Sequence, residues 1–295
     1  MLSRRQVLYS ALAAATGAAA YSAEVEPRWL QLSRRLVPMR HTGLAAPIRI
    51  LHLSDLHASA FVPLSLIDEA FSLALAERPD LICLTGDFVT GRDHPAPRAY
   101  SRSLRRLADR APTFAVLGNH DGGVWAAGIG GYPDHRLMER ILLEGGVTLL
   151  HNSPAALRVR DQLLTLAGLG DYWSEEIDPA RAFHGVDAAH PVIVLSHNPD
   201  SKARLASAPW DLMLSGHTHG GQVVVPFYGP PFLPVVDTRF VAGLRPWGPR
   251  LIHVTRGVGS LYGLRFACRP EAASLLLTPS NAPAPAVPGV REGLR

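Results

Sequence analysis

The sequence of 295 residues contains only two cysteines, Cys83 and Cys268, which lie far apart and form no C-x-x-C pair. So few thiols exclude a disulfide framework or a cysteine-rich zinc site as the basis of the fold. Cys83 lies inside the apolar run 81–84, a position that favours a buried and unreactive thiol. Beyond the N-terminus there is no long apolar run, so no later segment is expected to cross a membrane.

Net charge is scarce outside the first 40 residues. Those residues carry six arginines against two acids, which accounts for the whole formal charge of +4. The rest of the chain balances to zero and therefore lacks the basic surface typical of nucleic-acid binding, so a nucleic-acid partner is not expected. Hydrophobic residues make up 47% of the chain and charged residues 18%, a globular composition that excludes disorder of the whole chain.

The N-terminal residues 1–23 have the pattern of a targeting segment. Arg4 and Arg5 precede an uncharged stretch over residues 6–23, and this paired start resembles a twin-arginine export signal. We expect delivery by the export machinery to the periplasm or the outer face of the inner membrane, with cleavage near residues 20–22. A Sec signal and an uncleaved membrane anchor are the alternatives, because the stretch is only just long enough to span a bilayer.

Three further divisions follow from the pattern of residues. Residues 24–47 contain three prolines and are interpreted as a tether, with one edge strand possible at Leu36 and Val37. The folded body is expected over residues 48–278. Residues 279–295, with an alternating Ala-Pro sequence and no periodicity, are expected to be disordered.

Short apolar runs recur in the body, and each ends in a polar, glycine-bearing loop, which is the pattern of strands buried on both faces. These runs are residues 48–53, 81–85, 113–117, 191–196 and 211–215. Helical patterns at 63–77 and 97–109 separate the first three runs. This β-α-β-α-β order predicts a right-handed parallel core.

The second half of the chain has shorter and more closely spaced strand patterns, which predict antiparallel pairing. They are residues 147–150, 156–160, 163–167, 222–225, 251–255 and 274–278. Further helices fit at 134–144 and 200–207. Without any internal repeat, the economical architecture is an α/β fold in which two sheets pack face to face with helices outside.

Polar side chains follow the five buried strands at their carboxyl ends, where ligands bind in open α/β sheets. They are Asp55 and His57, then Asp87, then Asn119, His120 and Asp121, then His197, and finally His217 and His219. Each motif alone is weak evidence, since a single histidine or a Gly-Asp turn is more often structural. Together they cluster many ionisable groups, and divalent cations would compensate the cost of burying them.

Mixed ligation by aspartate, histidine and asparagine suits manganese, iron or zinc better than magnesium or calcium. Of these we expect Mn²⁺, with Fe or Zn as the alternatives. The candidate ligands are too numerous for one ion. Two ions about 3.5–4 Å apart, bridged by a carboxylate and a water, are therefore expected.

The same residues, in the series Asp-x-His, Gly-Asp, Gly-Asn-His-Asp, His and Gly-His-x-His, resemble the calcineurin-like metallophosphoesterase superfamily over residues 48 to about 278. With the twin-arginine start, the ending Gly-His-Thr-His-Gly-Gly-Gln at 216–222 is similar to an exported or membrane-associated bacterial subgroup of phosphodiesterases. Relatives of that subgroup include an enzyme that cleaves the pyrophosphate of UDP-2,3-diacylglucosamine. The resemblance implies a four-layer α/β/β/α sandwich of two mixed sheets.

The resemblance also implies a role for each position. Asp55, His57 and His219 would bind the first metal, Asp87 would bridge, Asn119, His197 and His217 would bind the second, and His120 would be the catalytic imidazole. The implied reaction is hydrolysis of a phosphodiester or pyrophosphate by a metal-bridged hydroxide. Its substrate would be a small molecule or lipid-linked, and His120 would protonate the leaving group or stabilise the transition state.

One position departs from the protein phosphatases of this superfamily, which have an aspartate three residues after the bridging aspartate to orient the catalytic histidine. Here that position is Thr90. Asp93 and Asp121 are the candidates to replace the missing carboxylate. Asp121 itself stands where those phosphatases have glutamate, which argues against a protein-phosphatase function.

Two other functions stay open. A nuclease is disfavoured by the neutral body, and a catalytically silent metal-binding module on the envelope is disfavoured by the complete set of ligands. Several aromatic residues fall in expected loops and could grip a nucleobase or a lipid, or could belong to the core. They are Trp125, Tyr172, Trp173, Trp210, Phe227 and Tyr228.

Overall fold

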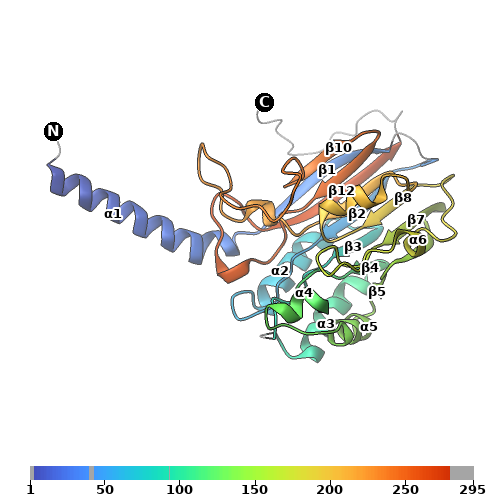
Figure 1. Ribbon diagram of the computed structural model, residues 1–295, viewed down its shortest axis with the longest axis horizontal. Coiled ribbons are helices and arrows are strands. Elements are labelled where there is room, and N and C mark those ends of the chain that lie inside the picture. The colour runs from blue at the N-terminus through green and yellow to red at the C-terminus, as the bar shows by residue number, and fades with distance from the viewer. Residues whose placement is uncertain (1–2, 40–42, 93, 280–295) are drawn as a thin grey trace.

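The computed structural model describes residues 3–39, 43–92 and 94–279, and in it two six-stranded sheets pack face to face (Figure 1). The first sheet contains, in spatial order, β1 (Gln31–Met39), β12 (Glu271–Pro279), β2 (Ile48–Leu53), β3 (Leu81–Thr85), β4 (Thr113–Val116) and β5 (Thr148–Leu149). The second contains β10 (Gly243–Trp247), β11 (Arg250–Val254), β9 (Leu212–Ser215), β8 (Val192–Leu195), β7 (Gln162–Gly168) and β6 (Ser153–Val159). Both sheets combine parallel and antiparallel pairs, so the predicted α/β sandwich of two mixed sheets is confirmed.

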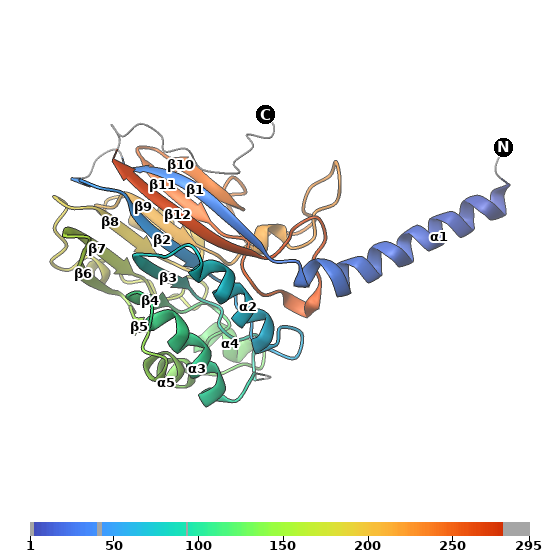
Figure 2. The same ribbon diagram turned by 180° about the vertical axis from the view of Figure 1, so that it is seen from behind.

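Three helices cover the outer face of the first sheet: α2 (Leu64–Leu75), α3 (Pro97–Ala108) and α5 (Arg136–Glu144) (Figure 2). The buried residues of α2 recur at helical spacing and include Ile67 and Phe71, so one face of the helix is apolar. That face packs in one cluster with residues of β2. The helices predicted at 63–77, 97–109 and 134–144 are thereby confirmed, with shorter ends.

The space between the sheets is filled by aliphatic side chains from both. Along β2, Ile48 and Ile50 point to this inner core, whereas Leu51 and Leu53 point to the outer helices. A strand buried on both faces places successive residues on opposite sides in this way. Cys83 lies in the inner core as predicted, and burial raises the pKa of its thiol.

The helical layer over the second sheet is thin. It contains the four-residue α6 (Pro179–Ala182) and a 3₁₀ helix, Pro199–Leu205, which lies where a helix was predicted at 200–207. Its core includes Trp210, which stacks on Trp247 with ring centroids 5.5 Å apart. Trp210 therefore belongs to the core and does not line a ligand site.

Two strand predictions in the second half are wrong. Residues 147–150 contain β5, which runs parallel to β4 and not antiparallel to a neighbour, because α5 provides a crossover between them. Residues 222–225 form no strand and make only single bridges, from Val223 to Phe266 and from Val225 to Gly229. Pro226 follows directly and cannot continue a strand ladder.

Residues 24–47 are more than a tether. The edge strand expected at Leu36 and Val37 extends over nine residues as β1 and pairs in parallel with β12. Pro38 is tolerated there because β1 is the edge of its sheet, where a missing N–H need not break a ladder. The folded body therefore begins before Ile48. Residues 280–295 of the predicted tail lie outside the described residues.

The N-terminal helix α1 (Arg4–Ala20) projects away from the body and has no buried residue (Figures 1 and 2). Ser3 caps its start in a capping box with Gln6. Among the residues that the structure describes, no helix combines the length and the apolar character needed to cross a membrane.

Candidate metal centre

The eight predicted site residues come together at one edge of the two sheets. They follow β2, β3, β4, β8 and β9, whose carboxyl ends meet there. All eight are buried, and seven of them expose 5% of their surface or less. The clustering that the strand ends predicted is therefore present.

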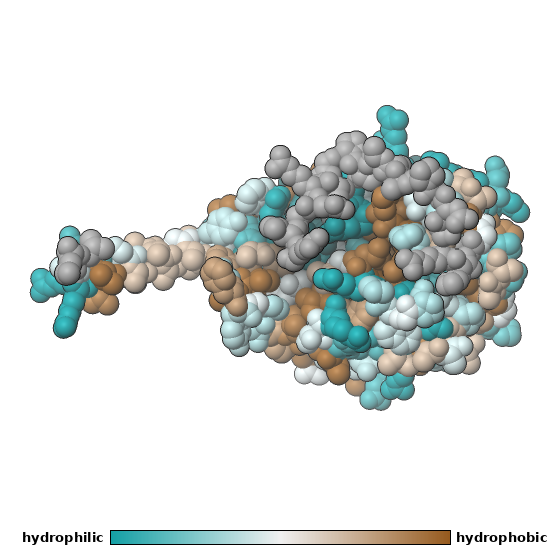
Figure 3. Space-filling model, turned by 90° about the horizontal axis from the view of Figure 1, so that it is seen from above, coloured by the Kyte–Doolittle hydropathy of each residue, from teal (hydrophilic) through white to brown (hydrophobic). Residues whose placement is uncertain are grey.

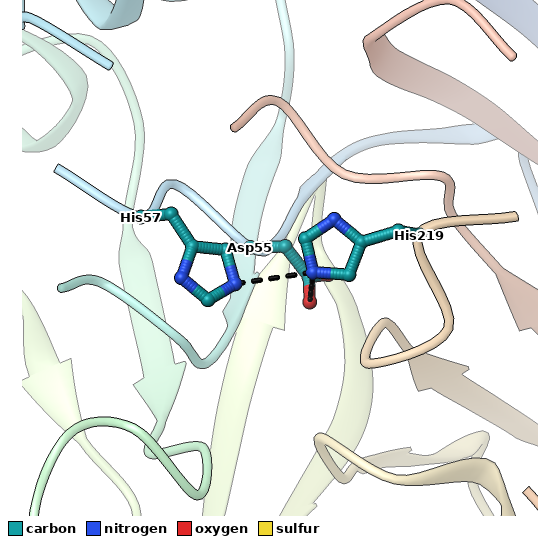
Figure 4. A group of neighbouring side chains, drawn as sticks. All are labelled: Asp55, His57 and His219. Carbon is teal, nitrogen blue, oxygen red and sulfur yellow. Dashed lines mark hydrogen bonds and ion pairs between the residues drawn. The ribbon is translucent and has the colours of Figure 1, made fainter. Parts of the chain in front are cut away.

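Asp55, His57 and His219 form the first group of potential metal ligands (Figure 4). Nε2 of His57 lies 3.1 Å from Nε2 of His219, which in turn lies 3.4 Å from Oδ1 of Asp55. The carboxylate of Asp55 also accepts the backbone N–H of His217. This bond ties the loop after β2 to the loop after β9.

Asp87, His197 and His217 form the second group. Nε2 of His197 lies 3.2 Å from Oδ2 of Asp87 and 3.2 Å from Nδ1 of His217. The same Oδ2 lies 3.4 Å from Nε2 of His57 in the first group. One oxygen of Asp87 thus lies between the two groups, in the place of a bridging ligand.

Hydrogen bonds on the outer side of the imidazoles determine which nitrogen faces inward. Nδ1 of His197 donates to the carbonyl oxygen of Thr85 at 2.7 Å, and Nε2 of His217 donates to that of Pro234 at 3.1 Å. Nδ1 of His57 lies 3.2 Å from the hydroxyl of Thr90. Nε2 of His197 and Nδ1 of His217 are therefore the nitrogens that face inward, as a metal-binding histidine requires. Burial would lower the pKa of His197, but Asp87 outweighs it and raises the pKa to about 10, so metal binding there would release a proton.

Residues of both groups have backbone angles that are rare outside glycine. The φ angles are 51° at Asp55, 46° at His57, 54° at Asp87, 68° at His217 and 52° at His219. Such left-handed conformations cost about 1–2 kcal/mol each in L-residues. Side chains are held in this way at functional sites, where the surrounding structure enforces the strain.

The residues present fit two divalent cations. Burial lowers the pKa of His217 to about 3, and burial with the neighbouring His57 holds the pKa of His219 well below its usual range, so both imidazoles stay neutral. Burial alone would raise the pKa of Asp87, but His197 and His120 outweigh it and hold that carboxyl ionised. Oδ1 of Asn119 is buried and has no hydrogen-bond partner among the described residues. Neutral inward nitrogens, an ionised carboxylate and an unpartnered amide oxygen are a donor set for cations.

His120 lies beside the two groups and not within them. Its Nδ1 donates to the backbone carbonyl oxygen of Thr90 at 2.9 Å, and its ring contacts His57 and Trp125 edge-on. The proposal that Asp121 orients His120 is wrong, because the Asp121 carboxylate accepts the N–H groups of Phe88, Val89 and Gly118 instead. Asp93 lies outside the described residues.

One buried carboxylate near the site was missed. Asp171 follows the carboxyl end of β7, and its Oδ1 has no hydrogen-bond partner among the described residues. Burial raises the pKa of Asp171, and the nearby His197 offsets part of this rise. The strand-end rule that selected the other residues would have found it, since it ends a Gly-Leu-Gly-Asp sequence after an apolar run.

A cleft of about 730 Å³ opens over the two groups. Asp87, Asn119, His120 and both histidines of the 217–219 loop line its floor, and Trp125, Trp173, Phe232 and Tyr262 line its walls. Trp173 contacts the ring of His217 at 4.3 Å between centroids. The cleft can therefore hold a substrate that is larger than a phosphate group and partly apolar.

Residues 48–221, which carry all of these ligands, match the family model described as calcineurin-like phosphoesterase. The chain belongs to the calcineurin-like phosphoesterase family. It is 45% identical over 279 residues to phosphodiesterase YaeI of Escherichia coli (strain K12), covering 94% of this chain and 100% of that protein. It is 29% identical to the uncharacterized metallophosphoesterase YkuE of Bacillus subtilis (strain 168), covering 95% and 99%. It is 28% identical to the UDP-2,3-diacylglucosamine pyrophosphatase LpxG of Chlamydia trachomatis serovar D, covering 84% and 89%.

Proposed function

We propose that this chain is a phosphodiesterase that uses two metal ions to hydrolyse a phosphodiester or a pyrophosphate. The observation that carries the proposal is the shared oxygen of Asp87, which lies 3.2 Å from His197 of one group and 3.4 Å from His57 of the other. Two sites joined by one carboxylate are the arrangement used for in-line displacement at phosphorus.

We further propose Mn²⁺ as the ion, with Fe and Zn as alternatives, because imidazole and carboxylate oxygen donors are mixed in both groups. Asp55, His57 and His219 would hold one ion, and Asn119, His197 and His217 the other, with Asp87 shared. Two bound cations would supply Lewis acidity toward the phosphoryl oxygens and a lowered pKa for a bound water.

His120 is the residue proposed to handle the leaving group. Its Nδ1 is occupied by the carbonyl oxygen of Thr90, so Nε2 is the nitrogen left for the substrate in the cleft. A proton carried at Nε2 can be donated to the departing oxygen. The fixed ring orientation keeps that proton aimed in one direction.

The proposed substrate is a small-molecule or lipid-linked phosphodiester or pyrophosphate. Support comes from the aromatic walls of the cleft and from the relatives, one named a phosphodiesterase and one a UDP-2,3-diacylglucosamine pyrophosphatase. The body of the chain carries no excess of positive charge, which disfavours a nuclease. The silent-module alternative is disfavoured because no ligand position has been replaced.

A direct test is hydrolysis of bis-p-nitrophenyl phosphate with added Mn²⁺, before and after chelation. We expect turnover that is lost with the chelator and restored by the ion. Absence of turnover with Mn²⁺, Fe²⁺ and Zn²⁺ alike would favour the catalytically silent module.

We also propose export through the twin-arginine route to the periplasm or the outer face of the inner membrane. The support is the Arg4-Arg5 pair at the start of a helix that carries no other charge. Changing both arginines to lysine should leave the protein in the cytoplasm, as measured by cell fractionation. Unchanged delivery would indicate the Sec route.

A further inference from the structure

Five aromatic side chains are exposed to solvent around the mouth of the cleft. Phe227 is fully exposed, and Tyr228, Phe232, Tyr262 and Phe61 expose between 62% and 77% of their surface. We call these five residues the aromatic rim. Exposed aromatic residues gathered in one place mark an interaction site on a soluble domain.

The rim comes from three loops that are joined to one another. Gln222 exchanges two hydrogen bonds with the backbone of Leu261, and Val224 donates to the carbonyl oxygen of Phe266. The loop at Gly263 approaches Phe61 closely enough that a Cβ atom there would lie 2.9 Å from its ring. The three loops are therefore joined to one another at their bases.

The helix α1 leaves the body from this same end (Figures 1 and 2). Its base is attached to the rim loop: Arg265 donates its backbone N–H to Ser22, and the rings of Tyr21 and Phe266 meet edge-to-face at 6.3 Å. The buried carboxylate of Glu26 accepts the backbone N–H groups of Ala267 and Cys268. These contacts hold residues 21–26, which follow α1 directly, against the rim loop.

Phe227 is held at the surface against local preference. It has a φ angle of 67° at the tip of a turn closed by the bond from Gly229 N–H to Val225 O. A left-handed conformation and full exposure are both unfavourable for a phenylalanine in water. A surface that covers this ring would remove the cost of exposing it to water.

The longest rim loop and α1 carry few charges, although the exposed ion pair Glu24–Arg28 lies at the base of α1 in one hollow with Phe61 and Tyr262. No charged residue occurs between His219 and Asp237, which brackets the longest rim loop, and none occurs in α1 after Arg5. In the space-filling view, α1 is pale to weakly hydrophobic beyond its hydrophilic tip, and both hydrophobic and hydrophilic residues lie on the body at its base (Figure 3). Aromatic side chains are enriched at the membrane–water interface.

We propose that the aromatic rim and α1 dock together on a lipid bilayer, with the mouth of the cleft facing the lipid. Phe232 and Tyr262 belong both to the rim and to the walls of the cleft, so the path to His120 begins at the docked surface. The identity of the substrate rests on the proposed phosphodiesterase function. The substrate is then an amphiphile whose phosphate reaches the metal centre while its acyl chains stay in the bilayer. The targeting segment is kept in this arrangement, because cleavage near residues 20–22 would remove the helix.

The test uses the full chain and vesicles of phosphatidylethanolamine and phosphatidylglycerol. The variant Phe227→Ser with Tyr228→Ser changes rim residues that do not line the cleft. The matched control is Leu143→Ser, on α5 and 77% exposed, at the opposite side of the body. We expect the wild type and the control to float with vesicles and the double variant to lose at least about tenfold in binding. Equal binding by all three, or no flotation of the wild type, would overturn the proposal.

Turnover separates this proposal from the proposed function. The double variant should hydrolyse soluble bis-p-nitrophenyl phosphate like the wild type, while its KM for a long-chain phosphodiester in vesicles rises at least about tenfold. An unchanged KM for the vesicle substrate would overturn the docking geometry. Rim-dependent flotation of a protein without any hydrolysis would instead contradict the proposed function and leave the membrane contact standing.

Discussion

The backbone carbonyl oxygen of Thr90 accepts a hydrogen bond from Nδ1 of His120 at 2.9 Å, while the hydroxyl of the same Thr90 lies 3.2 Å from Nδ1 of His57. One residue therefore orients both the proposed proton donor and a potential metal ligand. The carboxylate that is missing at this position is replaced by a backbone group, which no side-chain substitution removes. His120 is accordingly held in place despite the departure from the family pattern.

Thr90→Val should weaken metal binding and spare the orientation of His120. The variant loses the hydroxyl that contacts the outer nitrogen Nδ1 of His57 and so orients its inner nitrogen Nε2. Hydrogen bonds of this kind to a metal-binding histidine change metal affinity by about 10-fold or more. Thr90→Ser keeps the hydroxyl and is the matched control. Chelator competition measures the affinities, and equal values for the two variants would show that the hydroxyl has no such role.

His120→Ala should keep its metals and lose more activity with a poor leaving group than with a good one. An alkoxide must be protonated to depart, whereas p-nitrophenolate leaves unaided. We expect a loss of about 10²–10⁴ with an alkyl phosphodiester and a much smaller loss with bis-p-nitrophenyl phosphate. Equal losses would assign His120 to charge stabilisation or phosphate positioning.

Much of the site could be predicted because the buried strands are short apolar runs whose ends are marked by polar residues. Asp55 and Asp87 follow such runs directly, so their placement depends on local pattern alone. The carbonyl of Thr90 could not be predicted as the partner of His120, since every residue has a carbonyl and only the fold aims it. The left-handed φ angle of Asp87 could not be predicted either, because only the fold determines it.

The fold was less predictable where pairing is remote in sequence. β1 lies in a proline-bearing segment, and only its pairing with β12, more than 200 residues later, makes it a strand of nine residues. The run at 222–225 has strand-forming residues but is interrupted by Pro226 before a ladder can form. A remote tertiary contact decided the first case and a neighbouring proline the second.

Glu26→Ala should destabilise the protein by about 1–3 kcal/mol, because two buried N–H groups lose their acceptor. The loop concerned also includes Arg265, whose guanidinium binds the carbonyl oxygen of Gly259 behind the site. Glu24→Ala removes an exposed acid two residues earlier and serves as the control. Thermal unfolding measures both, and equal midpoints would contradict a structural role for Glu26.

Low pH should destabilise the fold through the buried pair His52 and His253, neither of which is a proposed metal ligand. Nδ1 of His253 lies 2.9 Å from Nδ1 of His52, and burial lowers the pKa of His253 to about 4. Because the unfolded chain takes up this proton near pH 6.5, its stabilising effect is complete above about pH 6.5 and is lost as the pH falls toward 4.

The variant His253→Gln should therefore show a smaller drop in Tm between pH 7 and pH 4 than the wild type, by about 4 °C or more. Both proteins should be measured after chelation, so that acid release of metal does not contribute. His190→Gln, at a partly exposed histidine outside the pair, is the control. Parallel Tm curves for His253→Gln and the wild type would refute the assignment.

The most direct measurement is a titration of chelated protein with Mn²⁺, in which bound metal and hydrolysis of bis-p-nitrophenyl phosphate are followed together. We predict that activity saturates at two ions per chain, and that Asp87→Asn loses both activity and most bound metal, because Oδ2 of Asp87 is shared by the two groups. Near-normal turnover by Asp87→Asn, or full activity of the wild type at one ion per chain, would contradict the dinuclear mechanism.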